Sequence, residues 1–126
     1  MHENEISYSI RGCIYDVFNH FGPGLLESVY EAALFECLSQ KGLSVEQQVP
    51  VGVSYLNTQL PVGFRLDLLV EKKVIIEVKS VELLAPVHHK QLITYLKLTG
   101  CKLGILVNFN CEEIEQGIFR KVNGLC

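Results

Sequence analysis

Residues Phe64–Ser80 read FRLDLLVEKKVIIEVKS, and the rest of the chain is most easily interpreted from them. Two apolar, β-branched runs, Phe64–Val70 and Val74–Lys79, flank the polar triplet Glu-Lys-Lys. This is the pattern of a β-hairpin with a three-residue connection, although the triplet lacks the glycine or asparagine usual in such turns. We therefore predict a hairpin in which Val70 faces Val74.

This register places the carboxylates of Asp67 and Glu77 directly opposite each other, where like charges destabilise a sheet. One explanation is a cross-strand ion-pair quartet that also contains Arg65 and Lys79. The other is a divalent cation between the carboxylates, because hard ions such as Mg²⁺ prefer oxygen ligands. The residues alone leave both explanations open. Strand alternation predicts two faces, one holding Leu66, Leu68, Val70, Val74, Ile76 and Val78, the other holding Arg65, Asp67, Glu77 and Lys79 together with Leu69 and Ile75.

Length and composition indicate one globular domain over residues 1–126. The chain is 48% hydrophobic and 20% charged, which excludes a disordered composition. Its mean hydropathy of +0.25 is high for a small monomer. We therefore expect an apolar surface that would serve a second copy, in a homodimer, or a larger partner complex.

The charge is unevenly distributed. The net charge of −3 does not indicate nucleic-acid binding by bulk attraction. Residues 1–63 carry two basic and seven acidic groups, a net charge of −5, whereas residues 64–126 carry nine basic and seven acidic groups, a net charge of +2. A site for a polyanion is expected in the second half.

Cysteine usage and the N-terminus indicate the compartment. The five cysteines form no CxxC pair and no zinc-binding spacing. A reducing, cytoplasmic location is the natural expectation. The acidic, polar start MHENEIS is not a signal peptide, and no apolar run is long enough to span a membrane, so we expect no membrane association.

Periodicity predicts an α/β (α+β) protein with the order α-α-β-β-β-α-β and an optional final strand. Gly22-Pro23-Gly24 separates the first two helices, and Pro86 stands where the third helix should begin. The predicted helices cover residues 4–21, 25–41 and 87–99; the predicted strands cover 45–55, 64–70, 74–79, 103–109 and 118–122.

Two of these helices carry polar residues of interest. Glu27 lies in the first turn of its helix, where the helix dipole favours a carboxylate without any further function. His88, Gln91 and Tyr95 share one face of the third helix. A capping or surface role would account for His88, and Tyr95 could be a core aromatic residue.

The hairpin residues suit phosphate chemistry. Glu77 and Lys79 are two positions apart in a strand and point the same way, and Asp67 joins them from across the pair. The carboxylates would hold Mg²⁺ against a phosphate oxygen and a water molecule, with the carbonyl of Val78 as a further ligand. The ammonium group would neutralise developing charge. A nuclease that hydrolyses phosphodiesters with a Mg²⁺-activated water needs little more.

The pattern D-(x)n-E-x-K on a hairpin resembles the core of the PD-(D/E)XK nuclease superfamily. Within it, the chain resembles the GxxExxY family, whose name motif matches GLLESVY at Gly24–Tyr30. The segments FRLDLLVEKKVIIEVKSVE, PVHHKQLITYLKLTG and KLGILVNF also resemble that family. The resemblance implies a RecB-like, restriction-endonuclease-like core, with a mixed four-stranded sheet flanked by helices.

The resemblance also implies roles for individual residues. Glu27, Asp67 and Glu77 would be metal ligands and part of the catalytic set, with Mg²⁺ as the cofactor and Mn²⁺ as a substitute. Lys79 would be the catalytic lysine. Gln91 and Tyr95 match the QxxxY motif of RecB-like nucleases, in which this helix positions the active site or contacts the strand, and so would bind substrate. His88, on the same helix face, is a further candidate for substrate binding.

Two positions depart from the family pattern. Leu66 stands where the superfamily name has proline, and His89 stands where the family has glutamate.

Three functional hypotheses are consistent with the sequence. The first hypothesis is a Mg²⁺-dependent deoxyribonuclease. The alternative is a catalytically weak or inactive nucleic-acid-binding or accessory module on the same fold. The third is a structural or oligomeric protein in which the hairpin charges form only an ion-pair cluster.

Overall fold

The computed structural model describes all residues 1–126 and has a five-stranded mixed sheet in the order β1-β2-β3-β4-β5. Only β3 and β4 are parallel; the other neighbours are antiparallel. The predicted order of elements is confirmed. The structure has helices α1 (Glu3–Phe21), α2 (Glu27–Gln40) and α3 (Pro86–Thr99), and strands β1 (Val45–Tyr55), β2 (Thr58–Val70), β3 (Val74–Lys79), β4 (Leu103–Asn108) and β5 (Ile118–Val122), with a short 3₁₀ helix, Ile114–Gly117, before β5.

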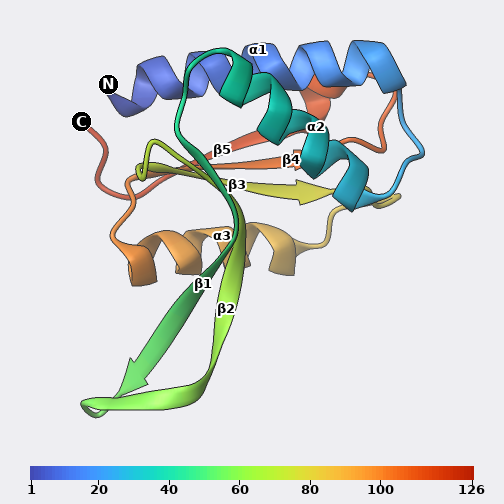
Figure 1. Ribbon diagram of the computed structural model, residues 1–126. Coiled ribbons are helices and arrows are strands. Elements are labelled where there is room, and N and C mark those ends of the chain that lie inside the picture. Colours follow the sequence, from blue (N-terminus) through green and yellow to red (C-terminus); the bar gives the residue numbers. More distant parts are fainter.

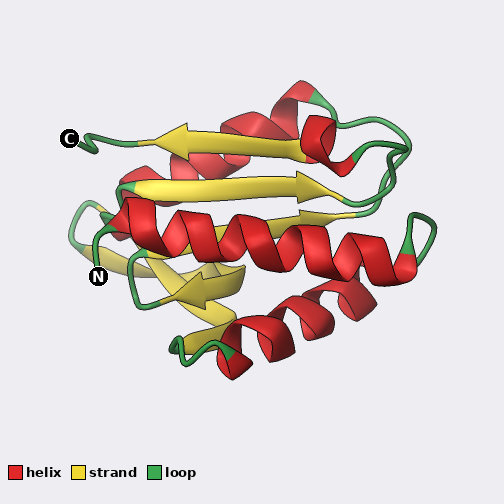
Figure 2. Cartoon of the chain, turned by 90° about the horizontal axis from the view of Figure 1, so that it is seen from above, coloured by secondary structure: helices red, strands yellow, loops and turns green.

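The sheet lies between two helical layers. Helices α1 and α2 cover one face and α3 covers the other (Figures 1 and 2). The larger core cluster joins α1 and α2 to the first face, and a smaller cluster joins α3 to the second. Strand β4 is buried along its whole length because it lies between both layers. The sheet has one strand more than the four that the resemblance implied, because the optional strand Ile118–Val122 pairs with β4.

Local capping interactions define the ends of helices α1 and α3. At the start of α1, His2 Nδ1 accepts a hydrogen bond from the Asn4 amide at 3.0 Å, and Glu5 accepts one from the His2 amide. Helix α3 begins at Pro86, whose missing N–H costs nothing in a first turn. It ends at Gly100, which has the left-handed φ of +78° typical of a C-terminal glycine.

Strands β1 and β2 form a long antiparallel ribbon that extends past α3 and away from the body of the molecule (Figure 1). The hairpin motif predicted β2 only from residue 64, but the strand begins at Thr58. The ribbon turns at Leu56 and Asn57, which both have left-handed φ angles, as a two-residue hairpin connection of type I′ requires. The additional residues of β2 pair with the outer half of β1.

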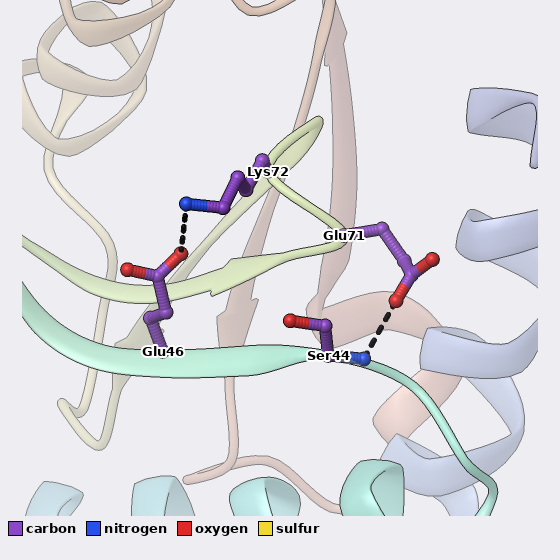
Figure 3. Close-up of polar contacts among 4 residues, drawn as sticks. All are labelled: Ser44, Glu46, Glu71 and Lys72. Carbon is purple, nitrogen blue, oxygen red and sulfur yellow. Dashed lines mark hydrogen bonds and ion pairs between the residues drawn. The ribbon is translucent and has the colours of Figure 1, made fainter.

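The β2–β3 connection explains how a turn without glycine is held. Val70 pairs with Val74 as predicted, and Glu71 and Lys72 have φ angles of +53° and +54°. The Glu71 carboxylate accepts a hydrogen bond from the Ser44 amide at 2.6 Å (Figure 3). The Glu71 amide donates to the Ser44 carbonyl at 2.7 Å. These two bonds fasten the strained turn to the chain just before β1.

The predicted division of the hairpin faces is wrong for Leu66. Leu68 and Val70 pack against α1 and α2, whereas Leu66 is buried in the cluster beneath α3. Strand β1 changes face at the same level. The cause is local: the β1–β2 register pairs the residues on either side of Gln48 and Asp67 but not these two, and Gln48 has a φ of +50°.

Candidate functional site

Strands β2 and β3 separate where the two opposed carboxylates lie. Their paired residues run from Val70↔Val74 to Leu68↔Ile76. Beyond this point, the Asp67 amide donates to Glu77 Oε2 at 2.9 Å, and the Val78 amide donates to Asp67 Oδ2 at 2.8 Å. Side-chain oxygens thus take the place of backbone carbonyls as partners of these two amides, and both carboxylates are held close to the split.

The ion-pair quartet considered for these strands does not form. The structure has a single ion pair within 4.0 Å, between Lys72 and Glu46 at the exposed turn (Figure 3). Arg65 instead donates to the Gln48 carbonyl at 3.3 Å. Lys79 affects the carboxylates only through its charge, which lowers the pKa of both Asp67 and Glu77.

Glu77 is the most deeply buried carboxylate of the site, at 6% exposure. Burial, followed by the charge of Asp67, raises the pKa of Glu77 to about 8. Burial also raises the pKa of Asp67, against the lowering effect of the Val78 amide. Ionising this buried carboxyl group is therefore unfavourable unless a positive charge lies nearby.

Helix α2 brings Glu27 to the end of β3. Glu27 is the first residue of α2, and its Oε2 accepts a hydrogen bond from the Ser80 amide at 3.0 Å. The Ser80 hydroxyl donates to the Leu25 carbonyl at 2.6 Å. Two bonds therefore tie the start of α2 to the residue that follows β3, and Glu27 does more than complement a helix dipole.

Tyr30 fixes the loop that leads into α2. It is fully buried and stacks on Phe109, with ring centroids 4.2 Å apart. Its hydroxyl donates to the Gly22 carbonyl at 2.5 Å and accepts from the Leu25 amide at 3.1 Å. Gly24, between them, has a φ of +103°, which favours glycine. The glycine and tyrosine of the motif thus shape the loop that presents Glu27.

Helix α3 contributes a polar face beside the split. Tyr95 stacks on Phe64 of β2, with ring centroids 4.1 Å apart. Burial and then the charges of Glu77 and Asp67 raise the pKa of Tyr95, while a hydrogen bond with the exposed Gln91 lowers it. Tyr95 therefore lies within electrostatic reach of the carboxylates.

His88 has a structural task in α3. Its Nδ1 accepts a hydrogen bond from the Ala85 amide at 3.0 Å, and its own amide donates to the Ala85 carbonyl at 3.0 Å. These bonds hold the first turn of the helix, which is the capping role considered from the sequence. A role in substrate binding stays a prediction. The neighbouring His89 lies edge-on to Phe119.

The sequence interpretation missed three polar residues around the site. Asn108 is buried, and its side chain makes hydrogen bonds with both the amide and the carbonyl of Val81, which secure the segment after β3. Glu31 accepts a hydrogen bond from Gln48 Nε2 at 2.9 Å. One signal was available for Glu31, because it follows Glu27 by four residues and so lies on the same face of α2.

The donor set fits a hard divalent cation in its chemistry. Glu27, Asp67 and Glu77 each use one oxygen to accept a backbone amide. The second oxygen of the Glu77 carboxylate has no hydrogen-bond partner, and no fully buried side-chain oxygen in the structure lacks one. The small exposed part of Glu77 therefore includes this second oxygen. The side chains are not preassembled: no group of three or more His, Cys, Asp and Glu residues is arranged to hold a metal ion.

An open hollow of about 500 Å³ adjoins Glu27 and Ser80 and is also lined by Leu25, Leu26 and Ser28. It leaves this end of the site accessible from outside.

None of the helices is both long and apolar enough to cross a membrane.

Comparisons with known proteins place this geometry in a wider group. The crystal structure of SSO0001 resembles the chain, with a TM-score of 0.58 and 24% sequence identity over 79% of this chain and 52% of the other. The chain thus spans about half the length of that protein, and the likeness concerns the fold alone. No curated protein gives a significant match.

The mixed sheet with helices on both faces is a restriction-endonuclease-like fold. Nucleases of the PD-(D/E)XK type generally use divalent metal ions. The sequence model of the PD-(D/E)XK nuclease superfamily matches residues 4–121, and the chain belongs to this superfamily.

Proposed function

We propose that the protein is a metal-dependent nuclease that hydrolyses DNA phosphodiester bonds with Mg²⁺, for which Mn²⁺ can substitute. The observation that carries the proposal is the split between β2 and β3, where Asp67 and Glu77 each accept the other strand's amide. A cation shared by these two carboxylates would offset the burial and the mutual repulsion that raise the pKa of Glu77 to about 8.

Within this proposal, the ligands are Glu27, Asp67 and Glu77, together with the carbonyl of Val78. Mg²⁺, when bound, would supply an activated water molecule and polarise the scissile phosphate. Lys79 stands two residues after Glu77 in the same strand, and its ammonium group would neutralise the charge that develops on the phosphate oxygens.

The polar face of α3 would position the DNA. Gln91 is exposed, and Tyr95 is half-buried beside the carboxylates, so both can reach a strand lying over the split. His88 keeps its Nε2 for such a contact while its Nδ1 caps the helix. Geometric positioning of this kind is a major part of catalysis in phosphoryl transfer.

The proposal also assigns the chain to the GxxExxY branch of the superfamily. Support comes from the tasks of the motif residues: Gly24 adopts a conformation that favours glycine, Tyr30 secures the loop with its hydroxyl, and Glu27 reaches the end of β3.

A cytoplasmic location belongs to the same proposal and rests on the cysteine content. Association in a homodimer or larger complex rests on exposed apolar residues such as Leu56 and Leu83.

One observation favours a second candidate, a nucleic-acid-binding or accessory module without turnover. The three carboxylates are not gathered into a ready metal site. Such a module would bind DNA with an affinity that falls as salt rises, but it would release no products.

Cleavage of end-labelled DNA by the purified chain separates the two functions. With Mg²⁺ or Mn²⁺ we expect products, and we expect Glu77→Ala or Lys79→Ala to lower kcat by about 10²–10³-fold. Lys90→Ala is the matched control, because this exposed lysine lies outside the carboxylate group. Undiminished cleavage in both site variants would overturn the assignment.

A further inference from the structure

Gln48 has an unusual backbone for the middle of a strand. Its φ is +50°, a left-handed value that is strained for a residue other than glycine. The residues on either side, Gln47 and Val49, pair regularly with β2, whereas Gln48 and the opposite Asp67 do not. A strained residue flanked by regular pairs is a candidate for a functional role, because such conformations persist only where the surrounding structure holds them.

The side chain of Gln48 lies between two carboxylates. Its Nε2 donates to Glu31 Oε1 at 2.9 Å and makes a longer contact of 3.5 Å with Asp67 Oδ1. The other oxygen of Asp67 accepts the Val78 amide at 2.8 Å. Both oxygens of Asp67 are therefore oriented, one by the backbone of β3 and the other by Gln48.

An amide suits this position for a chemical reason. The NH₂ group has two donor hydrogens, one for each neighbouring carboxylate, and carries no charge. The reversed orientation would place the amide oxygen against the same carboxylates. Gln48 is exposed, so these bonds add little to stability, and their effect is on orientation.

We propose that Gln48 is a positioning residue, whose amide, anchored by Glu31 of α2, sets the Asp67 carboxylate for metal binding. The inference rests on the proposed function, since it assigns a task inside the same site. Residues behind metal ligands orient them in this way, and their loss typically costs about 10–100-fold in metal affinity or activity.

The first test observes the bridge itself, in ¹⁵N-labelled, metal-free protein. Asp67→Asn should shift the side-chain amide signals of Gln48 and leave those of Gln47 in place, because Gln47 Nε2 bonds only Glu31, at 3.3 Å. Glu31→Gln should shift the signals of both glutamines. Unchanged Gln48 signals in Asp67→Asn would overturn the inference.

The second test measures Mn²⁺ affinity by calorimetry. Glycine adopts the left-handed backbone of position 48 without strain, so Gln48→Gly removes the amide and keeps the fold. We expect Mn²⁺ to bind this variant about 10-fold more weakly than the wild type, with KM for DNA unchanged. Gln47→Ala, the matched control, should bind Mn²⁺ as the wild type does.

The outcomes separate the two claims. Equal Mn²⁺ affinity in the wild type and Gln48→Gly overturns the positioning role and leaves the proposed function standing. A wild type that binds no Mn²⁺ overturns the proposed function, and the Gln48 signals in Asp67→Asn then decide whether the amide holds Asp67.

Discussion

The Asp67 amide donates a hydrogen bond to Glu77 Oε2 at 2.9 Å, so the Glu77 side chain supplies the acceptor for the backbone of the opposite strand where β2 and β3 separate. Glutamine in place of Glu77 keeps an oxygen acceptor of the same shape and removes the charge. We expect Glu77→Gln to fold at least as stably as the wild type in chelator and to lose Mn²⁺ binding, as measured by urea unfolding and calorimetry. Mn²⁺ affinity equal to that of the wild type would argue against Glu77 as a ligand.

The stability of the metal-free protein should depend on pH through the same residue. Burial raises the pKa of Glu77 from an ordinary 4.5 to about 8. Between these values the folded protein keeps a proton that the unfolded chain has lost, so stability falls as pH rises through this range. Raised pKa values of Asp67 and Glu31 act in the same direction.

Urea unfolding in chelator at about pH 5 and about pH 9 measures this decline. In Glu77→Gln the position no longer titrates, and the decline should be clearly smaller. An equal decline in the variant and the wild type would show that other groups cause it.

Tyr30 should support both stability and the site. Tyr30→Phe leaves the Gly22 carbonyl and the Leu25 amide without their hydroxyl partner. We expect the free energy of unfolding to fall by about 1–3 kcal/mol. DNA cleavage should also weaken, because the same loop presents Glu27.

Tyr8→Phe is the control for this change, since Tyr8 is 82% exposed and should be indifferent to loss of its hydroxyl. Chemical denaturation of both variants gives the comparison. Equal stability of the two variants would mean that the Tyr30 hydroxyl does not secure the loop.

The β2–β3 turn allows a stabilising substitution. Lys72 has a φ of +54°, and its ion pair with Glu46 is long, at 3.8 Å, with the lysine side chain 79% exposed. Glycine at this position relieves the strain at little cost, so Lys72→Gly should raise the free energy of unfolding by about 0.5 kcal/mol.

The adjacent Lys73→Gly is the contrasting variant. Lys73 has no left-handed φ to relieve, and its side chain donates to the Met1 carbonyl. This substitution should lower the melting temperature whereas Lys72→Gly raises it. Shifts of the same sign in both would contradict the strain at Lys72.

Much of this architecture could be predicted from local patterns. Alternating valines gave the bounds of β1, and the two runs of the hairpin gave the Val70↔Val74 pair. The face of Leu66 could not be predicted, because simple alternation fails where the backbone of Gln48 turns left-handed. Nothing in the residue type signals that conformation, since glutamine has no special preference for it.

The part of the candidate site that lies within one hairpin could be predicted from residue spacing. The part that depends on packing between separate elements could not. Spacing alone placed Asp67 opposite Glu77, whereas the family resemblance was needed to add Glu27 to the group. The contact between Glu31 and Gln48 joins residues 17 positions apart, and it depends on how α2 packs on β1. No local pattern records that packing.

A crystal structure of the protein soaked with Mn²⁺ tests the central claim most directly. We predict an anomalous peak at the split between β2 and β3, within about 2.0–2.6 Å of carboxylate oxygens from Asp67 and Glu77, with Glu27 completing the protein ligands. A fully soaked crystal with no peak there, or with Mn²⁺ bound only elsewhere, would contradict the account.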